Sequence, residues 1–110
     1  LSVNYGVARP IPYCASGIPP KKNPNEYDGF RNAKIELDDF VKGKGRRPTV
    51  FNNHEGILPN VPRMTYYEFD LGGDRQGGRG RHRAIIGYDG SPNRVYYYTD
   101  NHYRSFCKIR

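Results

Sequence analysis

One stretch of the chain has the hydrophobic spacing of an amphipathic helix. Between about Glu26 and Lys42, apolar residues recur three and four positions apart, which places them on one helix face. The residues on this face are Phe30, Ala33, Leu37, Phe40 and Val41. Asn25 precedes the pattern and Gly43 follows it. These residue types favour helix ends, so the pattern predicts one helix capped by Asn25 and ended by Gly43.

After the helix, the sequence has the composition of short β-strands. Five segments rich in Val, Ile, Tyr, Phe or Thr are separated by Gly, Pro, Asn and Asp. They are Thr49–Asn52, Met64–Leu71, Arg83–Tyr88, Arg94–Thr99 and Tyr103–Ile109. An alternating stretch near Ser2–Val7 predicts a hairpin edge before the helix. One helix followed by sequential strands predicts an α+β fold, with an N-terminal helix packed on a twisted antiparallel β-sheet.

Length and composition narrow the classes of protein that this pattern allows. The chain has 110 residues, and we expect residues 1–110 to form a single domain. Only 35% of the residues are hydrophobic, while 13 are Gly and 9 are Pro, as in a compact, turn-rich domain. No apolar run approaches the roughly 20 residues of a membrane span, which excludes a transmembrane protein.

The chain is strongly basic. Eighteen Lys and Arg residues face eleven Asp and Glu residues, for a net charge of +7 and a pI near 9.6. Such a surface favours polyanions, either nucleic acid or anionic lipid. The absence of a basic amphipathic helix argues against a lipid surface. Excess charge also serves solubility, so the charge alone leaves nucleic-acid binding open.

The two cysteines, Cys14 and Cys107, lie near opposite ends of the chain. This spacing suggests one disulfide that clamps the termini of a secreted protein, and the alternative is two unrelated buried thiols. Closing so long a loop stabilises a fold by up to about 4–5 kcal/mol in the chain-entropy model. The chain starts at Leu1 without a signal-like segment, so we expect a processed mature chain or an excised domain.

The segment Met64–Leu71 has one apolar and one polar face at a two-residue period. The first face carries Tyr67, Phe69 and Leu71 and resembles core. The second carries Tyr66, Glu68 and Asp70. Taken alone, Glu68 is explained equally well as a solvated glutamate on an open sheet face.

Cationic residues elsewhere give Glu68 a second interpretation. Arg79, Arg81 and Arg83 lie in or after a glycine-rich loop, and His102 lies in a turn. Cleavage of RNA by its own 2′-hydroxyl needs a base, an acid and cations for the charge that develops on phosphorus. A carboxylate, an imidazole and guanidiniums supply these three roles. His102 alone is also explained as a surface turn residue.

Metal and nucleotide-cofactor motifs are missing from the sequence. The histidines His54, His82 and His102 lack H-E-x-x-H spacing, and the cysteines lack C-x-x-C spacing. The glycine-rich segment Gly72–Arg81 lacks the G-x-x-x-x-G-K-[ST] pattern of a phosphate loop. We therefore expect no metal and no cofactor.

Four segments of the chain form a wider pattern when they are taken in order. They are VFNNHEGILP at residues 50–59, YYEFD at 66–70, RAIIG at 83–87 and TDNHYRSF at 99–106. In this order they resemble the guanine-recognition loop, general-base strand, phosphate-binding strand and general-acid turn of the microbial guanyl-specific ribonucleases, the family of barnase and ribonuclease Sa. The likeness covers about residues 48–110 and extends more weakly to Cys14–Pro20.

The resemblance implies catalytic roles for specific residues. Glu68 would be the general base and His102 the general acid. Arg83 would bind the phosphate, assisted by Arg79 or Arg81.

The resemblance also implies how a base is recognised. Glu55 would accept the N1–H and 2-amino hydrogens of guanine, a donor pair that no other base offers. Backbone amides near Asn52 and Asn53 would donate to O6, and Phe51 and Tyr103 would stack on the base. Without the resemblance, residues 52–56 are explained as a simple turn.

The chain departs from the family pattern at several places. Thr49 stands where some fungal members have a second catalytic histidine. The region Arg79–Arg83 is longer and more basic than usual, and extra residues occur around Tyr88–Arg94. Cys107 lies inside the last strand rather than close to the terminus.

The function implied by the resemblance is a secreted, metal-independent endoribonuclease. It would cleave single-stranded RNA 3′ to guanosine through a 2′,3′-cyclic phosphate. One alternative is a ribonuclease-like effector or RNA-binding protein without catalysis. Another is the toxin domain of a longer secreted protein, neutralised by an acidic inhibitor protein. We expect a monomer whose partner is single-stranded RNA, with no membrane partner.

Overall fold

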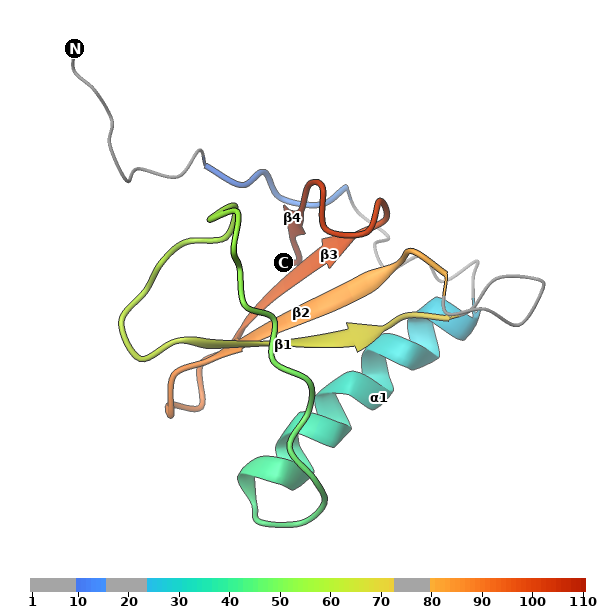
Figure 1. Ribbon diagram of the computed structural model, residues 1–110. Coiled ribbons are helices and arrows are strands. Elements are labelled where there is room, and N and C mark those ends of the chain that lie inside the picture. The colour runs from blue at the N-terminus through green and yellow to red at the C-terminus, as the bar shows by residue number, and fades with distance from the viewer. Residues whose placement is uncertain (1–9, 16–23, 73–79) are drawn as a thin grey trace.

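The computed structural model describes residues 10–15, 24–72 and 80–110 (Figure 1). Its elements are α1 (Pro24–Val41), β1 (Thr65–Asp70), β2 (Arg83–Tyr88), β3 (Val95–Thr99) and β4 (Cys107–Lys108). The strands form one antiparallel sheet in the order β1-β2-β3-β4, and α1 lies against one side of it. The predicted α+β fold is confirmed. The hairpin edge predicted at Ser2–Val7 lies outside the described residues.

Helix α1 ends where predicted and begins earlier. It starts at Pro24, so Asn25 lies inside the first turn and the predicted cap is wrong. At the other end Gly43 has φ of 79°. Its N–H donates to the Phe40 carbonyl at 3.0 Å, and the Lys44 N–H donates to Asp39 at 2.7 Å. These two bonds satisfy carbonyls of the last turn, and the positive φ that they require favours glycine.

Two buried clusters join α1 to the sheet. One contains Cys14, Phe30, Leu71, Ala84 and Tyr98, and the other contains Ala33, Leu37, Tyr67, Phe69 and Ile86. The predicted helix face and the predicted apolar face of β1 therefore meet in the core. Val41 is an exception, because it is 38% exposed at the end of the helix. Within the described residues, no helix is both long and apolar enough to cross a membrane.

The opposite face of the sheet carries a third cluster, which loops cover instead of a helix. Its buried members are Leu58, Tyr66, Ile85, Tyr97 and Phe106. Leu58 and Phe106 come from segments outside the strands, so this cluster holds two loops against the sheet. The apolar contacts on this face fix the loops that carry most of the candidate site residues.

Two of the five predicted strands are much shorter in the structure. Thr49–Asn52 forms only an isolated bridge, Val50 to Tyr67, on the outer edge of β1. Of Tyr103–Ile109, only Cys107 and Lys108 are strand, because the preceding residues turn. His102 and Tyr103 have φ values of 56° and 73°, which no β-strand accommodates.

The predicted disulfide between Cys14 and Cys107 is present and joins positions 93 residues apart. It fastens the segment before α1 to β4. Two backbone hydrogen bonds support the connection, from Cys14 N to Lys108 O at 2.9 Å and from Lys108 N to Pro12 O at 2.8 Å. The alternative of two unrelated thiols is wrong.

Candidate active site

The register of the sheet places Glu68 and Arg83 on the same face. Glu68 is paired with Ile85, and Asp70 is paired with Arg83. Paired residues point to the same side of a sheet, so Glu68, Asp70 and Arg83 share the face opposite α1. This face carries the third cluster, with the half-buried Glu68 next to its apolar side chains along the strand.

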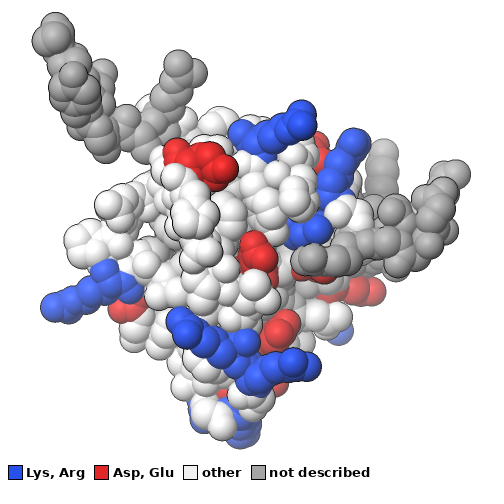
Figure 2. Space-filling model, in the orientation of Figure 1, with Lys and Arg blue, Asp and Glu red and all other residues white. Residues whose placement is uncertain are grey.

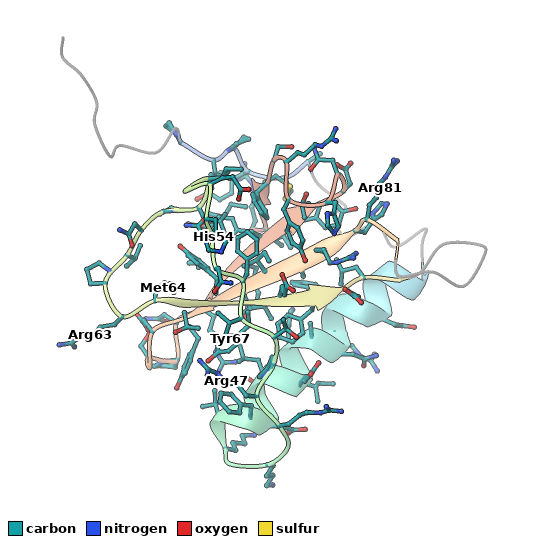
Figure 3. All side chains as sticks on the ribbon, viewed as in Figure 1. Arg47, His54, Arg63, Met64, Tyr67 and Arg81 are labelled. Carbon is teal, nitrogen blue, oxygen red and sulfur yellow. A yellow bond between two sulfur atoms is a disulfide. The ribbon has the colours of Figure 1, made fainter. Side chains whose placement is uncertain are left out.

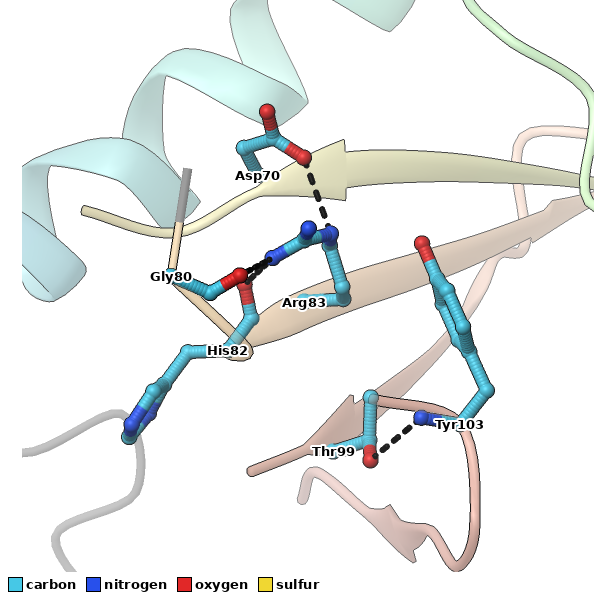
Figure 4. A network of polar contacts seen from close by, with 6 residues as sticks. All are labelled: Asp70, Gly80, His82, Arg83, Thr99 and Tyr103. Atoms are coloured by element: carbon cyan, nitrogen blue, oxygen red, sulfur yellow. Dashed lines mark hydrogen bonds and ion pairs between the residues drawn. The ribbon is translucent and has the colours of Figure 1, made fainter. Parts of the chain in front are cut away.

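The Arg83 side chain is fixed by its own turn and by β1 (Figure 4). It is only 2% exposed. Its Nη1 donates to the Gly80 and His82 carbonyls at 3.0 and 2.9 Å. Its Nε forms an ion pair with Asp70 Oδ1 at 2.9 Å, without the alignment of a hydrogen bond. A buried cation in a fixed position suits the developing charge of a phosphoryl group.

Tyr103 connects Glu68 and Arg83. The sequence alone did not predict this connection. The pKa of Tyr103 is raised to about 12, first by burial and then by the hydrogen bond and negative charge of Glu68, while Arg83 acts in the opposite direction. The hydroxyl is therefore neutral and donates to the Glu68 carboxylate. The Arg83 guanidinium carbon lies 6.0 Å from the Tyr103 ring centroid. Figure 4 shows the ring extending from its loop toward the strands of Asp70 and Arg83.

The ring of Tyr103 stacks on Phe51, with centroids 5.0 Å apart and planes at 29°. Phe51 in turn contacts Phe106, at 5.8 Å between centroids. These contacts tie the predicted recognition loop to the turn of His102. Sequence reasoning assigned Phe51 and Tyr103 to base stacking, and that role stays a prediction. Their positions show that they also form the wall between the two loops.

His102 is exposed in a turn that is fastened to the start of β2. Its N–H donates to the Arg81 carbonyl at 3.1 Å, and its ring lies 4.7 Å from the ring of Tyr103. The Thr99 hydroxyl donates to Asn101 Oδ1 at 2.8 Å and accepts the Tyr103 N–H at 3.2 Å. These contacts hold the turn in its left-handed conformation, with the imidazole beside the ring of Tyr103.

The predicted recognition loop is an ordered turn closed by Asn53. The Asn53 amide donates to Leu58 O at 2.9 Å, and its oxygen accepts the Leu58 N–H at 3.1 Å. The Tyr66 hydroxyl donates to Pro59 O at 2.6 Å. Burial and the neighbouring Tyr97 raise the pKa of Tyr66 to about 12. The Asn53 side chain is thus used inside the loop, while Asn52 and Glu55 are exposed.

The predicted base-binding residues line two different hollows. Glu55 belongs to a pocket of about 460 Å³ between the loop, the first described segment and the turn after His102. Its other lining residues are Pro10, Ile11, Pro12, Gly56, Ile57, Arg104, Ser105 and Phe106. Phe51, Asn52 and Asn53 line a second pocket of about 520 Å³. A single base can contact all of these residues only if it lies where the two pockets adjoin.

The structure does not place the other basic residues considered for the site, Arg79 and Arg81, beside Glu68 and Arg83. Arg81 is exposed, and Figure 3 shows it across the sheet face from His54. Arg79 lies outside the described residues. The Nδ1 of His82 lies 2.7 Å from the hydroxyl of Tyr98. Because Tyr98 belongs to the core between the sheet and α1, His82 is not part of the site formed by Glu68 and Arg83. In the described parts of the chain, no three His, Cys, Asp or Glu side chains gather as a metal site would require.

Charge by itself does not locate the site. Figure 2 shows Lys and Arg side chains distributed over one face of the molecule, with Asp and Glu between them. The distinguishing feature is the convergence of Glu68, Arg83 and His102 on Tyr103. This set contains a carboxylate, a fixed guanidinium and an imidazole, which are the chemical groups that general-base, charge-stabilising and general-acid roles require.

Two comparisons with known proteins bear on this site. A sequence profile described as ribonuclease matches residues 13–110. The chain is also similar to guanyl-specific ribonuclease St of Saccharopolyspora erythraea, with 40% identity over 58 residues. That match covers 53% of this chain and 54% of the relative, so it spans about half the length of each protein.

Proposed function

Since the chain belongs to the ribonuclease family, we propose that it is an endoribonuclease that cleaves single-stranded RNA 3′ to guanosine. The observation that carries the proposal is the convergence of Glu68, Arg83 and His102 on Tyr103. The likeness to guanyl-specific ribonuclease St supports the base preference. The loop with Glu55 supplies a carboxylate for it.

The proposed reaction has two steps. Glu68 removes the proton of the 2′-hydroxyl, and the 2′-oxygen attacks phosphorus. His102 gives a proton to the departing 5′-oxygen as the P–O5′ bond breaks, which leaves a 2′,3′-cyclic phosphate. The roles then reverse: His102 takes a proton from water, the water oxygen bonds to phosphorus, and Glu68 protonates the 2′-oxygen as the P–O2′ bond breaks. The product is a 3′-phosphate.

Arg83 and Tyr103 serve the same reaction without exchanging a proton. The fixed guanidinium of Arg83 stabilises the charge on the pentavalent phosphorus, and its burial strengthens that interaction. The neutral hydroxyl of Tyr103 donates to Glu68 and orients the carboxylate. No step requires a metal ion, so we propose metal-independent cleavage.

Guanine recognition follows from the donors of the base. Glu55 accepts the N1–H and the 2-amino group, and backbone amides of the loop donate to O6.

A disulfide suits an oxidising compartment, so we also propose that the enzyme acts outside the cell. We propose a monomer and, if the protein is a toxin, an acidic inhibitor protein that is attracted by the net positive charge of the chain.

The first experiment is cleavage of a short RNA that contains one guanosine, with EDTA present and mass analysis of the products. We expect a cut 3′ to the guanosine and a cyclic phosphate end. Matched RNAs carry inosine or adenosine at that position. Inosine lacks the 2-amino donor, so its cleavage should be about tenfold or more slower, because one hydrogen bond to a charged group is lost.

Other results would contradict specific parts of the proposal. Intact RNA at high enzyme concentration would contradict catalysis and favour an RNA-binding or effector protein. Equal cleavage at guanosine and adenosine would contradict the role of Glu55. Cleavage abolished by EDTA would contradict metal independence.

A further inference from the structure

Residues 49–51 cross the outer edge of β1 and separate two hollows; we call them the crossing segment. The segment is fixed by hydrogen bonds from Phe51 N to Tyr66 O and from Glu68 N to Thr49 O, both 2.8 Å. On one side lies a hollow of about 390 Å³, which Thr49 and Glu68 line. On the other side lies the pocket of about 520 Å³, which Val50 and Phe51 line. We call this second hollow the Arg47 pocket.

The two hollows have opposite charge. Three carboxylates, from Glu36, Glu68 and Asp70, line the smaller one. Arg47 is the one charged residue among the described residues that line the Arg47 pocket. A phosphate group is therefore repelled by the first hollow and attracted by the second.

The lining of the Arg47 pocket suits a nucleobase beside a phosphate. Its walls are apolar at Val61 and Met64, and they carry amide groups at Asn52 and Asn60. Apolar walls with a few polar groups are typical of small-molecule sites of this size. The Arg47 guanidinium carbon lies 6.0 Å from the centroid of the Tyr67 ring, and Figure 3 shows the two residues on the same side of β1.

The proposed reaction gives the RNA strand a direction across this surface. His102 protonates the departing 5′-oxygen, so the nucleotide 3′ to the cut leaves on the His102 side. The strand 5′ to the guanosine leaves on the other side of Glu68, toward the crossing segment. There it meets either the carboxylate-lined hollow or the Arg47 pocket.

On these grounds we propose that the Arg47 pocket binds the nucleotide immediately 5′ to the cleaved guanosine, with Arg47 at its linking phosphate and its base in the pocket. This inference rests on the proposed function. It assigns a role to an arginine that the catalytic steps do not use, in a pocket that shares Phe51, Asn52 and Asn53 with the predicted guanine loop.

The test compares kcat/KM for three substrates: GpU, pGpU and ApGpU. The second adds the 5′-phosphate alone, and the third adds the upstream nucleoside as well. For the wild-type protein, kcat/KM should rise from GpU to pGpU and again to ApGpU. The overall gain should be about tenfold, the size of one good contact to a charged group.

Arg47→Ala should remove most of the gain between GpU and pGpU, and Arg47→Lys should retain part of it because a charge remains. Arg46→Ala is the matched control, since it removes the same charge from an adjacent exposed position that does not line the pocket. Thermal unfolding of each variant checks that the fold is intact. The salt dependence of kcat/KM on ApGpU should also weaken, by about 0.7 in the log–log slope, for Arg47→Ala only.

Each contrary outcome has a distinct meaning. Cleavage of GpU without any gain on the longer substrates would overturn this inference and leave the proposed function standing. If Arg46→Ala reduced the gain in kcat/KM from GpU to pGpU as much as Arg47→Ala does, general charge attraction would explain the gain and the inference would be overturned. The same holds if Arg47→Ala lowered kcat/KM equally for all three substrates. Equal kcat/KM values for pGpU and ApGpU would contradict binding of the upstream base in the Arg47 pocket. No cleavage of any substrate would overturn the proposed function and this inference together.

Discussion

At the scale of single residues, Glu68 is the position on which the proposed chemistry depends most. It lies in mid-strand, half-buried, with a neutral tyrosine hydroxyl donating to it and a fixed guanidinium on the same sheet face. The hydrogen bond from Tyr103 holds this carboxylate in one orientation, as the proposed general base requires.

Glu68→Gln should lower kcat/KM on guanosine-containing RNA by a factor of about 10² to 10⁴, the usual contribution of a general base. The matched control is Glu36→Gln, which removes a carboxylate from the same hollow but from helix α1. Initial rates on the single-guanosine RNA measure both variants. Activity within about threefold of wild type for Glu68→Gln would rule out the base assignment.

Two tyrosine hydroxyls, those of Tyr66 and Tyr103, should titrate near pH 12, because burial raises the pKa of each to about 12. The unfolded chain titrates near pH 10. Their contribution to stability is therefore complete below pH 10 and is lost as the pH rises through 12. Tyrosinate absorbance and denaturant unfolding, both followed against pH, measure this.

Tyr103→Phe should remove one of the late transitions from that titration, whereas Tyr13→Phe, at a ring that is 55% exposed, should leave both. Ionisation of every tyrosine of the folded protein below pH 11 would contradict the buried environments of Tyr66 and Tyr103.

At the scale of elements, the two loops over the sheet are each closed by one polar side chain. Asn53 bonds twice to Leu58, and Thr99 bonds to Asn101 and Tyr103. Both segments contain non-glycine residues with positive φ, Asn53 at 56° in one and His102 and Tyr103 in the other. Side-chain hydrogen bonds compensate for the cost of that backbone conformation.

Asn53→Ala should destabilise the protein by about 1–2 kcal/mol, because two partly buried hydrogen bonds are lost and a positive φ remains. It should also raise KM for guanosine-containing RNA more than it lowers kcat, because the loop would no longer be held for binding. Asn52→Ala, at the exposed neighbouring position, should change stability by less than about 0.5 kcal/mol. Urea unfolding and steady-state kinetics test both effects, and equal stabilities for the two variants would contradict the role of Asn53.

At the scale of the whole molecule, the disulfide and the two-sided sheet determine the shape. The sheet buries one face against α1 and the other against loops, so β2, between them, is buried along most of its length. The Cys14–Cys107 bond holds the segment before α1 against β4. That segment also supplies Pro10, Ile11 and Pro12 to the pocket of Glu55.

Replacing both cysteines, as Cys14→Ser with Cys107→Ser, should lower the free energy of unfolding by up to about 4–5 kcal/mol, since the bond closes a loop of 93 residues. Denaturant unfolding of wild type with and without reductant, beside the double variant, measures the loss. Reductant should destabilise wild type and leave the variant unchanged. An unchanged wild-type midpoint after complete reduction would show that the bond contributes nothing.

Local patterns determined the elements and the chemistry that each residue type offers. The 3.6-residue spacing of Phe30, Ala33 and Leu37 predicted the buried helix face, and the alternation of Tyr67 and Phe69 predicted the buried face of β1. These predictions succeeded because the period of a helix or strand is set by the backbone, and burial follows that period. The residue types at 68, 83 and 102 also suggested a base, a cation and an acid, and these roles stay predictions.

Only the tertiary structure decided which of these residues meet. The register of β1 and β2 put Glu68 and Arg83 on one face, and the left-handed turn at His102 and Tyr103 directed the tyrosine between them. That turn also ended the strand predicted for Tyr103–Ile109, and α1 began before its predicted cap at Asn25. Strand register, loop closure and stacking such as that of Phe51 on Tyr103 depend on contacts between residues distant in sequence, and local periodicity carries no information about those contacts.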